Sequence, residues 1–222
     1  ESILNPIDYY ECNIQGTINL LRAMNNSDCK KLIFSSSANV YGTPRYLPID
    51  ENHPINPLTP YGKSKYFIEQ ILKDWSSVNS KRGVVSLRYF NPIGNHPSGV
   101  IGEDPKSKFD NIFPIICNTL LQKPKVVHIF GDNYETIDGT GVRDYIHVMD
   151  LANAHKLSVN FLQNYNGFHP INLGTGIGTS VKQLIKIFST VSGQKVPVLI
   201  KDKRKGDISS SFANFTKAKE KL

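Results

Sequence analysis

Two side chains of the sequence have the types and the spacing of a group that removes a proton from an alcohol. Tyr61 and Lys65 lie four residues apart in the run Tyr-Gly-Lys-Ser-Lys, so a helix would place both on one face. A phenol has a pKa of about 10 and is a weak base at neutral pH, but a neighbouring ammonium group stabilises the phenolate. We therefore expect Lys65 to lower the pKa of Tyr61, which then accepts a proton from a substrate hydroxyl.

Ser37 is expected to be the third member of this catalytic group. It follows the apolar run Leu32-Ile33-Phe34, which is typical of a buried strand. Ligands of open α/β sheets bind at the carboxyl ends of the strands, so a serine there can hydrogen-bond the same hydroxyl and pass on its proton. A tyrosine beside a solvated lysine is common on protein surfaces, and it is the upstream serine loop that favours a catalytic interpretation.

The elements that must position these residues alternate between helix and strand. Apolar spacing predicts helices at 6–24, 59–75, 112–121, 147–162, 180–191 and the last turns, and strands at 32–34, 84–90, 126–130, 171–173 and 196–200. Thr59 is the expected N-cap of the Tyr61 helix and Pro60 its first residue. Such alternation favours parallel strand pairing and an α/β fold, with loops at 43–58 and 94–110.

Composition and charge are those of a globular chain with a basic surface. The 222 residues are 39% hydrophobic, and 26 Lys+Arg against 19 Asp+Glu give a net charge of +7. This excess, dense in Lys201–Lys205, attracts polyanions or serves as a solvated surface. No stretch is long and apolar enough for a membrane span, so we expect no membrane association. Three isolated cysteines argue against disulfides and zinc, and favour a cytoplasmic protein that binds no metal.

Several longer motifs resemble the extended short-chain dehydrogenase/reductase family and, within it, the UDP-hexose 4-epimerases. The similarity covers essentially the whole chain, and the segment Asp138–His147 (Asp-Gly-Thr-Gly-Val-Arg-Asp-Tyr-Ile-His) is the most specific part. The other segments that carry it are Ser35–Gly42, Pro60–Lys65, Arg88–Pro92, His96–Gly99 and Gly102–Pro105.

The resemblance implies a Rossmann-like, doubly wound parallel sheet that holds NAD tightly. Residues 1–91 would form the carboxyl-terminal part of the NAD-binding domain, and residues 92–222 mainly a smaller nucleotide-sugar-binding α/β region, with some segments returning to the first sheet. The phosphate-binding glycine motif of the family is absent. Because the chain also opens at Glu1 without a methionine, we expect a piece of a longer protein, one that also ends early for the family.

The nearest local candidate for such a motif is Gly174-Thr175-Gly176-Ile177-Gly178, between a predicted strand and a predicted helix. Its glycine spacing differs from the dinucleotide fingerprint, and no acid follows about 20 residues later. We interpret it as a structural turn of the substrate region.

The resemblance also implies the reaction and its residues. Tyr61, helped by Ser37 and Lys65, deprotonates the 4-hydroxyl of UDP-galactose or UDP-glucose. The resulting 4-keto sugar rotates within the site and is then reduced on its other face. The cofactor residues would be Asn13, Ser37, Tyr61, Lys65 and Phe90. The substrate residues would be Ser37, Tyr61, Asn91, Asn111, Ile112, His128, Ile129, Phe130, Arg143, Arg204, Asp207 and Ser211. A homodimer through two helices per subunit, including the Tyr61 helix, is implied as well.

Two departures bear on specificity and on the alternatives. Ala38-Asn39 stands where dehydratases of the family carry acids, which favours epimerisation over loss of water. Ser211 is smaller than the tyrosine of some members, so N-acetylhexosamine nucleotides would also fit. The alternatives are another nucleotide-sugar epimerase or decarboxylase, or a catalytically silent relative that binds RNA. The RNA alternative expects a lost Tyr or Lys and aromatics among the basic residues, neither of which occurs, so no nucleic-acid partner is expected.

Overall fold

A three-stranded parallel sheet forms the centre of the computed structural model, which describes residues 1–103, 111–121, 126–204 and 206–222. Its order is β1 (Lys31–Ser37), β2 (Gly83–Tyr89) and β6 (Gly167–Leu173). The predicted strands and their parallel pairing are confirmed. Asp104, Pro105 and Lys205 of the motifs above, and the end of the predicted 94–110 loop, lie outside the described residues.

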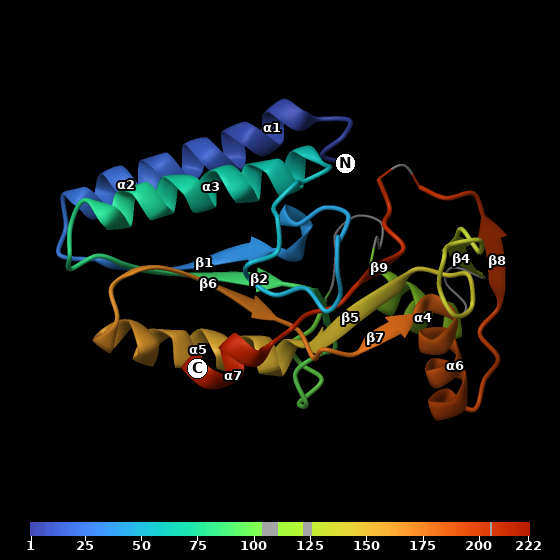
Figure 1. Ribbon diagram of the computed structural model, residues 1–222. Coiled ribbons are helices and arrows are strands. Elements are labelled where there is room, and N and C mark those ends of the chain that lie inside the picture. The colour runs from blue at the N-terminus through green and yellow to red at the C-terminus, as the bar shows by residue number, and fades with distance from the viewer. Residues whose placement is uncertain (104–110, 122–125, 205) are drawn as a thin grey trace.

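Helices cover both faces of this sheet (Figure 1). α1 (Pro6–Tyr10), α2 (Gly16–Asn25) and α3 (Pro60–Ser77) lie on one face, and α5 (Val148–Asn164) and α7 (Thr216–Lys221) on the other. β2 is almost wholly buried because its alternating side chains enter two cores, a pattern typical of a central parallel strand. One core contains Leu21, Met24, Ile68, Leu72, Trp75 and Val84, and the other Val85, Leu87, Phe161, Leu162 and Ile171.

The predicted helix from Pro6 to Met24 is present but contains a wider turn. α1 passes into a π-helical turn, Glu11–Gln15, and then into α2, with helical backbone angles at both junctions. A π turn accommodates one extra residue, which apolar spacing alone does not reveal. Asn13, a predicted cofactor residue, lies inside this turn.

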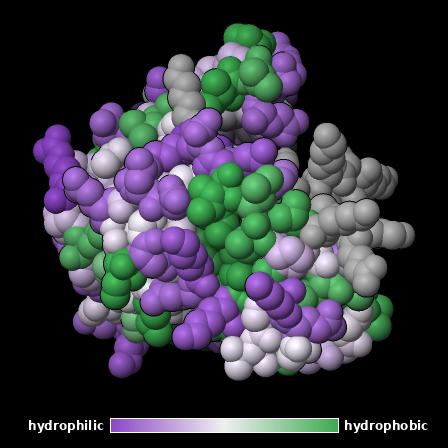
Figure 2. Space-filling model, turned by 90° about the vertical axis from the view of Figure 1, so that its right-hand side faces the viewer, coloured by the Kyte–Doolittle hydropathy of each residue, from purple (hydrophilic) through white to green (hydrophobic). Residues whose placement is uncertain are grey.

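A second group of strands continues from the carboxyl end of the first sheet (Figure 1). β5 (Val142–His147) lies between β3 (Asn91–Ile93) and β7 (Gly178–Ser180), with β9 (Ser210–Ser211) also paired to β5. Next to it, β4 (Val127–Phe130) pairs in parallel with β8 (Val198–Lys201), and α4 (Ile112–Leu120) and α6 (Val181–Ser192) pack with β4 around Ile116, Ile129 and Leu184. Figure 2 shows the side on which β8 lies, where Val198, Leu199 and Ile200 are exposed.

Strand β5 was not expected from the sequence. Val-Arg-Asp-Tyr-Ile-His mixes charged, aromatic and aliphatic residues and does not read as an apolar run. Asp144 and Ile146 are buried, whereas Arg143 and Tyr145 lie on the opposite face, as the two-residue period of a strand requires. Arg143 and Asp144 therefore lie on opposite faces of β5 and have different surroundings.

The buried carboxylate of Asp144 ties β5 to two distant segments. It accepts hydrogen bonds from Thr175 N (2.7 Å), Thr175 Oγ1 (2.6 Å), Gly176 N (2.9 Å) and Ala213 N (3.0 Å). A Cβ at Gly174 would lie 2.4 Å from Asp144 Oδ2, so only glycine permits this approach. The glycine-rich segment after β6 thus encloses a carboxylate of the chain itself, in agreement with its interpretation as a structural turn.

Two further findings concern the described residues only. None of the helices among them is both long enough and apolar enough to cross a lipid bilayer. Likewise, the described part of the chain contains no group of three or more His, Cys, Asp or Glu side chains that could hold a metal ion.

Candidate functional site

Tyr61 meets Ser37 because α3 begins directly against the loop that follows β1. Thr59 caps the helix by accepting a hydrogen bond of 3.2 Å from Gly62 N, and Pro60 is the first helical residue, as predicted. A Cβ at Gly62 would lie 2.6 Å from the carbonyl oxygen of Asn39, so glycine allows the helix to touch this loop. Ser37 is the last residue of β1, and its hydroxyl lies close enough to Tyr61 to lower the pKa of that phenol in part.

The expected lowering of the Tyr61 pKa by Lys65 is wrong for this chain. Burial raises the pKa of Tyr61, and the hydrogen bond with Ser37 opposes this rise only in part. Lys65 Nζ lies 5.7 Å from the centroid of the Tyr61 ring and donates a hydrogen bond of 3.0 Å to Ser35 O. Burial lowers the pKa of Lys65 itself. The helical spacing correctly places the two side chains together, but burial sets the direction in which the pKa of each group moves.

A buried carboxylate on the same helix holds α3 to the strands. Glu69 accepts hydrogen bonds from Ser36 Oγ (2.7 Å) and Ser86 Oγ (2.9 Å), and from Arg88 Nε (2.9 Å) and Nη2 (2.6 Å). Ser36 directly precedes Ser37, and Glu69 lies one helical turn beyond Lys65. The carboxylate therefore fixes the distance between the strand that carries the serine and the helix that carries the tyrosine.

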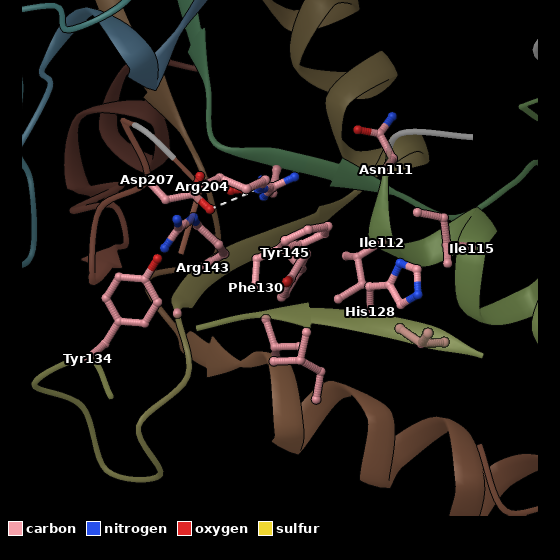
Figure 3. A pocket seen from close by; sticks show the side chains of 15 residues that line it. Asn111, Ile112, Ile115, His128, Phe130, Tyr134, Arg143, Tyr145, Arg204 and Asp207 are labelled. Carbon is pink, nitrogen blue, oxygen red and sulfur yellow. Dashed lines mark hydrogen bonds and ion pairs between the residues drawn. The ribbon is translucent and has the colours of Figure 1, made fainter. Parts of the chain in front are cut away.

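Two adjoining cavities open beside Ser37 and share the residues Asn91, Arg143, Arg204 and Asp207. The first, of about 180 Å³, is shown in Figure 3 and is also lined by Asn111, Ile112, Ile115, Val127, His128, Ile129, Phe130, Tyr134, Gly141, Tyr145 and Val181. The second, of about 240 Å³, is also lined by Ser37, Ala38, Asn39, Gly42, Leu58, Thr59, Phe90, Gly206, Ile208 and Ser211.

Two guanidinium groups lie where the cavities join (Figure 3). Arg204 forms an ion pair of 2.9 Å with Asp207, and its guanidinium carbon lies 4.7 Å from the centroid of the Phe130 ring. Arg143 Nη1 donates to Val142 O over 2.9 Å, and burial lowers the pKa of its guanidinium although Asp207 opposes this. The neighbouring Asp144 is occupied by the Gly174 turn and is not its partner. The junction is therefore suited to an anion that accepts bidentate hydrogen bonds.

Most of the predicted substrate residues come together at these cavities. The first contains Asn111, Ile112, His128, Ile129 and Phe130, the second contains Ser37, Phe90 and Ser211, and both contain Asn91, Arg143, Arg204 and Asp207. Of the predicted residues, all of which the structure describes, Asn13, Tyr61 and Lys65 line neither cavity. Tyr61 is linked to the second through Ser37, and Asn13 Nδ2 donates to Ser64 Oγ over 3.0 Å.

Several lining residues were not identified from the sequence, among them Tyr134 and Tyr145. Tyr145 lies two residues after Arg143 on β5, so both side chains point to the same face. Recognition of that strand would have identified it. Tyr134 lies in a loop after β4, where no periodicity indicates which way a side chain points.

The chain is similar to known proteins of one family. Residues 1–174 match the model of the NAD dependent epimerase/dehydratase family. The chain is 47% identical over 223 residues to UDP-glucose 4-epimerase of Mus musculus and 46% identical over 222 residues to that of Bacillus subtilis (strain 168), which covers 100% of this chain in each case. The chain spans 64% and 66% of those two relatives, just under two thirds of their lengths.

A solved structure agrees equally well over the described fold. The crystal structure of UDP-glucose 4-epimerase from Bifidobacterium longum in complex with NAD+ and UDP has a TM-score of 0.95 and 45% sequence identity. The match covers 100% of this chain and 66% of that one. On the family match and on these relatives, the chain belongs to the NAD dependent epimerase/dehydratase family.

Proposed function

We propose that this chain carries the catalytic tyrosine and the nucleotide-sugar site of an NAD-dependent UDP-hexose 4-epimerase. Its reaction is the reversible interconversion of UDP-galactose and UDP-glucose through a 4-keto sugar, a step of galactose metabolism. The observation that carries the proposal is the placement of Tyr61 next to Ser37, beside two cavities that meet at Arg143 and Arg204. The relatives named above, which are UDP-glucose 4-epimerases, support it.

The two cavities match the two ends of a nucleotide sugar. Apolar and aromatic side chains in the first, such as Ile112 and Phe130, suit a flat base. The second cavity contains Ser37 and is the more polar in its residues, as a hexose with several hydroxyls requires. The arginines at the junction then bind the diphosphate that connects the two halves.

The residues around Lys65 fit NAD. The ammonium group of Lys65 has three donors, and within the described residues its one hydrogen bond goes to Ser35 O. Two donors remain for the hydroxyls of the nicotinamide ribose, and the buried Phe90 lines the second cavity together with Ser37. When bound, NAD supplies a reversible acceptor for the hydrogen on carbon 4 of the sugar.

The chemical step follows from the positions of two hydroxyl groups. Tyr61 accepts the proton of the sugar 4-hydroxyl, and Ser37 hydrogen-bonds the same oxygen and keeps it within reach. Because burial raises the pKa of Tyr61, the phenolate needs additional positive charge when the complete site forms, and Lys65, whose Nζ lies 5.7 Å from the centroid of the Tyr61 ring, can supply it. The proton returns from Tyr61 after the 4-keto sugar has turned over.

The alternatives find less support in the cleft. Ala38 and Asn39 line the second cavity, which we assign to the sugar, and neither residue is acidic. The acid and base that a dehydratase needs to eliminate water are therefore missing at these positions. For an RNA-binding relative, the arginines should lie on an open surface, whereas Arg143 is largely buried in the cleft. Ser211 lines the same cavity and leaves room for an N-acetyl group, so we propose UDP-N-acetylhexosamines as further substrates.

We also propose the larger organisation that the sequence suggested. Residues 1–91 belong to the NAD-binding domain and residues 92–222 mainly to the substrate-binding region of a cytoplasmic homodimer. The exposed Phe67 on α3, whose ring centroid lies 6.4 Å from that of Tyr10, supports an interface through α3 and α1. Light scattering on the full-length protein tests the dimer.

The decisive experiment is the variant Tyr61→Phe in the full-length protein. Epimerisation of UDP-galactose should fall by about 10²- to 10⁴-fold because the base is lost, while UDP binds within about twofold of the unaltered affinity. Tyr165→Phe, at an exposed tyrosine stacked on Phe161, is the matched control and should retain full activity. Chromatography of the products must give UDP-glucose. A Tyr61→Phe protein with ordinary activity would contradict the proposal.

A further inference from the structure

The first cavity, which the proposed function assigns to the nucleotide and which we call the nucleotide-side cavity, contains a polar group that the proposed mechanism leaves unused. We propose that Tyr134 is a further substrate-binding residue whose hydroxyl donates a hydrogen bond to a phosphate oxygen of the bound nucleotide. This inference rests on the proposed function and adds a third donor to the two arginines at the junction of the cavities.

The hydroxyl of Tyr134 is buried and has no hydrogen-bond partner among the described residues. Buried hydroxyl groups are nearly always paired, since an unpaired one loses its hydrogen bonds to water without replacement. Tyr134 also lines the nucleotide-side cavity. A ligand in that cavity is the natural partner for its hydroxyl.

The surroundings of this oxygen favour an anionic partner. The charges of Asp207, Arg143 and Arg204 all act on the pKa of Tyr134. Figure 3 shows the ring of Tyr134 pointing toward Arg143. Burial raises the pKa of Tyr134, so the group stays protonated and can donate. An acceptor that is itself attracted by two guanidinium groups fits this position, and a phosphate is such an acceptor.

The fold holds the ring of Tyr134 without any help from its hydroxyl. Gly131 has a φ of +84°, and a Cβ there would lie 2.7 Å from Cε2 of the ring. Lys203 Nζ lies 4.3 Å from the ring centroid and donates a hydrogen bond to Asn133 O. The backbone is held as well, because Tyr134 N donates to Gly139 O over 2.9 Å. The ring is thus positioned by packing and backbone contacts, and the hydroxyl is left for another purpose.

The location within the cleft indicates which part of the ligand is contacted. Tyr134 lines only the cavity that we assign to the nucleoside, although it lies beside the shared residues Arg143, Arg204 and Asp207. It therefore reaches the phosphates from the nucleoside side. Asp207, the other acceptor nearby, is already paired with Arg204.

The test compares Tyr134→Phe with the unaltered full-length protein in titrations with UDP, UMP and uridine. Phenylalanine keeps the ring on Gly131 and Lys203 and removes only an unpaired hydroxyl, so the melting temperature of the unliganded protein should not fall. We expect UDP to bind about tenfold more weakly, as for a lost hydrogen bond to a charged group, and uridine to bind within about twofold of normal. Tyr165→Phe is the matched control and should bind all three ligands normally.

Two results would overturn the inference while leaving the proposed function in place. One is unchanged affinity for UDP, and the other is an equal loss for uridine, which would place the hydroxyl on the nucleoside. Absence of UDP binding by the unaltered protein would instead overturn the proposed function, and this inference with it. A loss for UDP without a loss for UMP still supports it and assigns the contact to the outer phosphate.

Discussion

Arg88 on β2 and Tyr41 in the loop after β1 form a buried pair. Arg88 Nη1 donates a hydrogen bond of 2.8 Å to the Tyr41 hydroxyl, and the guanidinium carbon lies 5.0 Å from the centroid of the tyrosine ring. The hydroxyl donates in turn to Asn172 Oδ1 over 2.7 Å, and so connects β2 with β6. Burial raises the pKa of Tyr41 to about 12, although Arg88 lowers it in part.

This raised pKa predicts how stability changes in alkaline solution. Below pH 10 both the folded and the unfolded states hold the proton, so the contribution of Tyr41 is fully present. Between about pH 10 and 12 the unfolded chain loses the proton first, and about 3 kcal/mol of stability disappears. Tyr41→Phe should be less stable by about 1–3 kcal/mol at pH 8, because it leaves partners unpaired, but the difference should shrink as pH rises. Urea unfolding at several pH values measures this, and a constant difference would contradict it.

The Glu69 carboxylate should be the most costly single group to remove from the helix α3. Glu69→Ala leaves Arg88 as an uncompensated buried charge and should lower the free energy of unfolding by about 3–5 kcal/mol. Glu69→Gln keeps the shape and some of the hydrogen bonds and should lose less.

A second measurement separates positioning from stability. In Glu69→Gln, assayed well below its unfolding temperature, kcat should fall while KM for UDP-galactose stays the same, because Ser37 and Tyr61 are misaligned but the nucleotide site is untouched. A folded Glu69→Gln protein with normal kcat would show that the carboxylate only stabilises the fold.

Ser211 should determine which sugars the second cavity admits. It is buried on β9, pairs with Arg143 of β5 and lines the cavity that contains Ser37. Ser211→Tyr fills that space, so turnover of UDP-N-acetylgalactosamine should be lost while turnover of UDP-galactose persists. The unaltered full-length protein must accept both sugars. If it turns over UDP-galactose and leaves UDP-N-acetylgalactosamine untouched, the proposal of a wider specificity is wrong.

Local signals explain which parts of the fold were predictable. The Thr59-Pro60 start and the Ile68, Leu72 stripe are encoded within a few residues, and α3 has the expected beginning and buried face. β2 matches its predicted range within one residue, whereas β1 and β6 begin or end a few residues beyond the apolar runs that predict them, because hydrogen bonding to neighbouring strands continues past the buried part. The π turn depends on packing between helices and has no such signal.

The candidate site was predictable only for residues that helical spacing or the family resemblance identified. Helical spacing placed Tyr61 beside Lys65, but the pKa of the tyrosine depends on how many atoms surround it, which spacing does not contain. The arginines were identified through the family resemblance, whereas the sequence alone left open whether Arg143 pairs with Asp144. That question is decided by the turn at Thr175, which is distant in the chain.

The hydrogen bonds that Thr175 and Ala213 donate to Asp144 have a consequence for the order of folding. Its partners Thr175 and Ala213 lie 31 and 69 residues further along the chain, so large loops must close before the carboxylate is satisfied. Contacts of such long range form late, whereas the helix with Tyr61 consists of local contacts and can form early. We therefore expect the helix that carries Tyr61 to form during synthesis before the pocket around Arg143, which is complete only after Ala213 has been added to the chain.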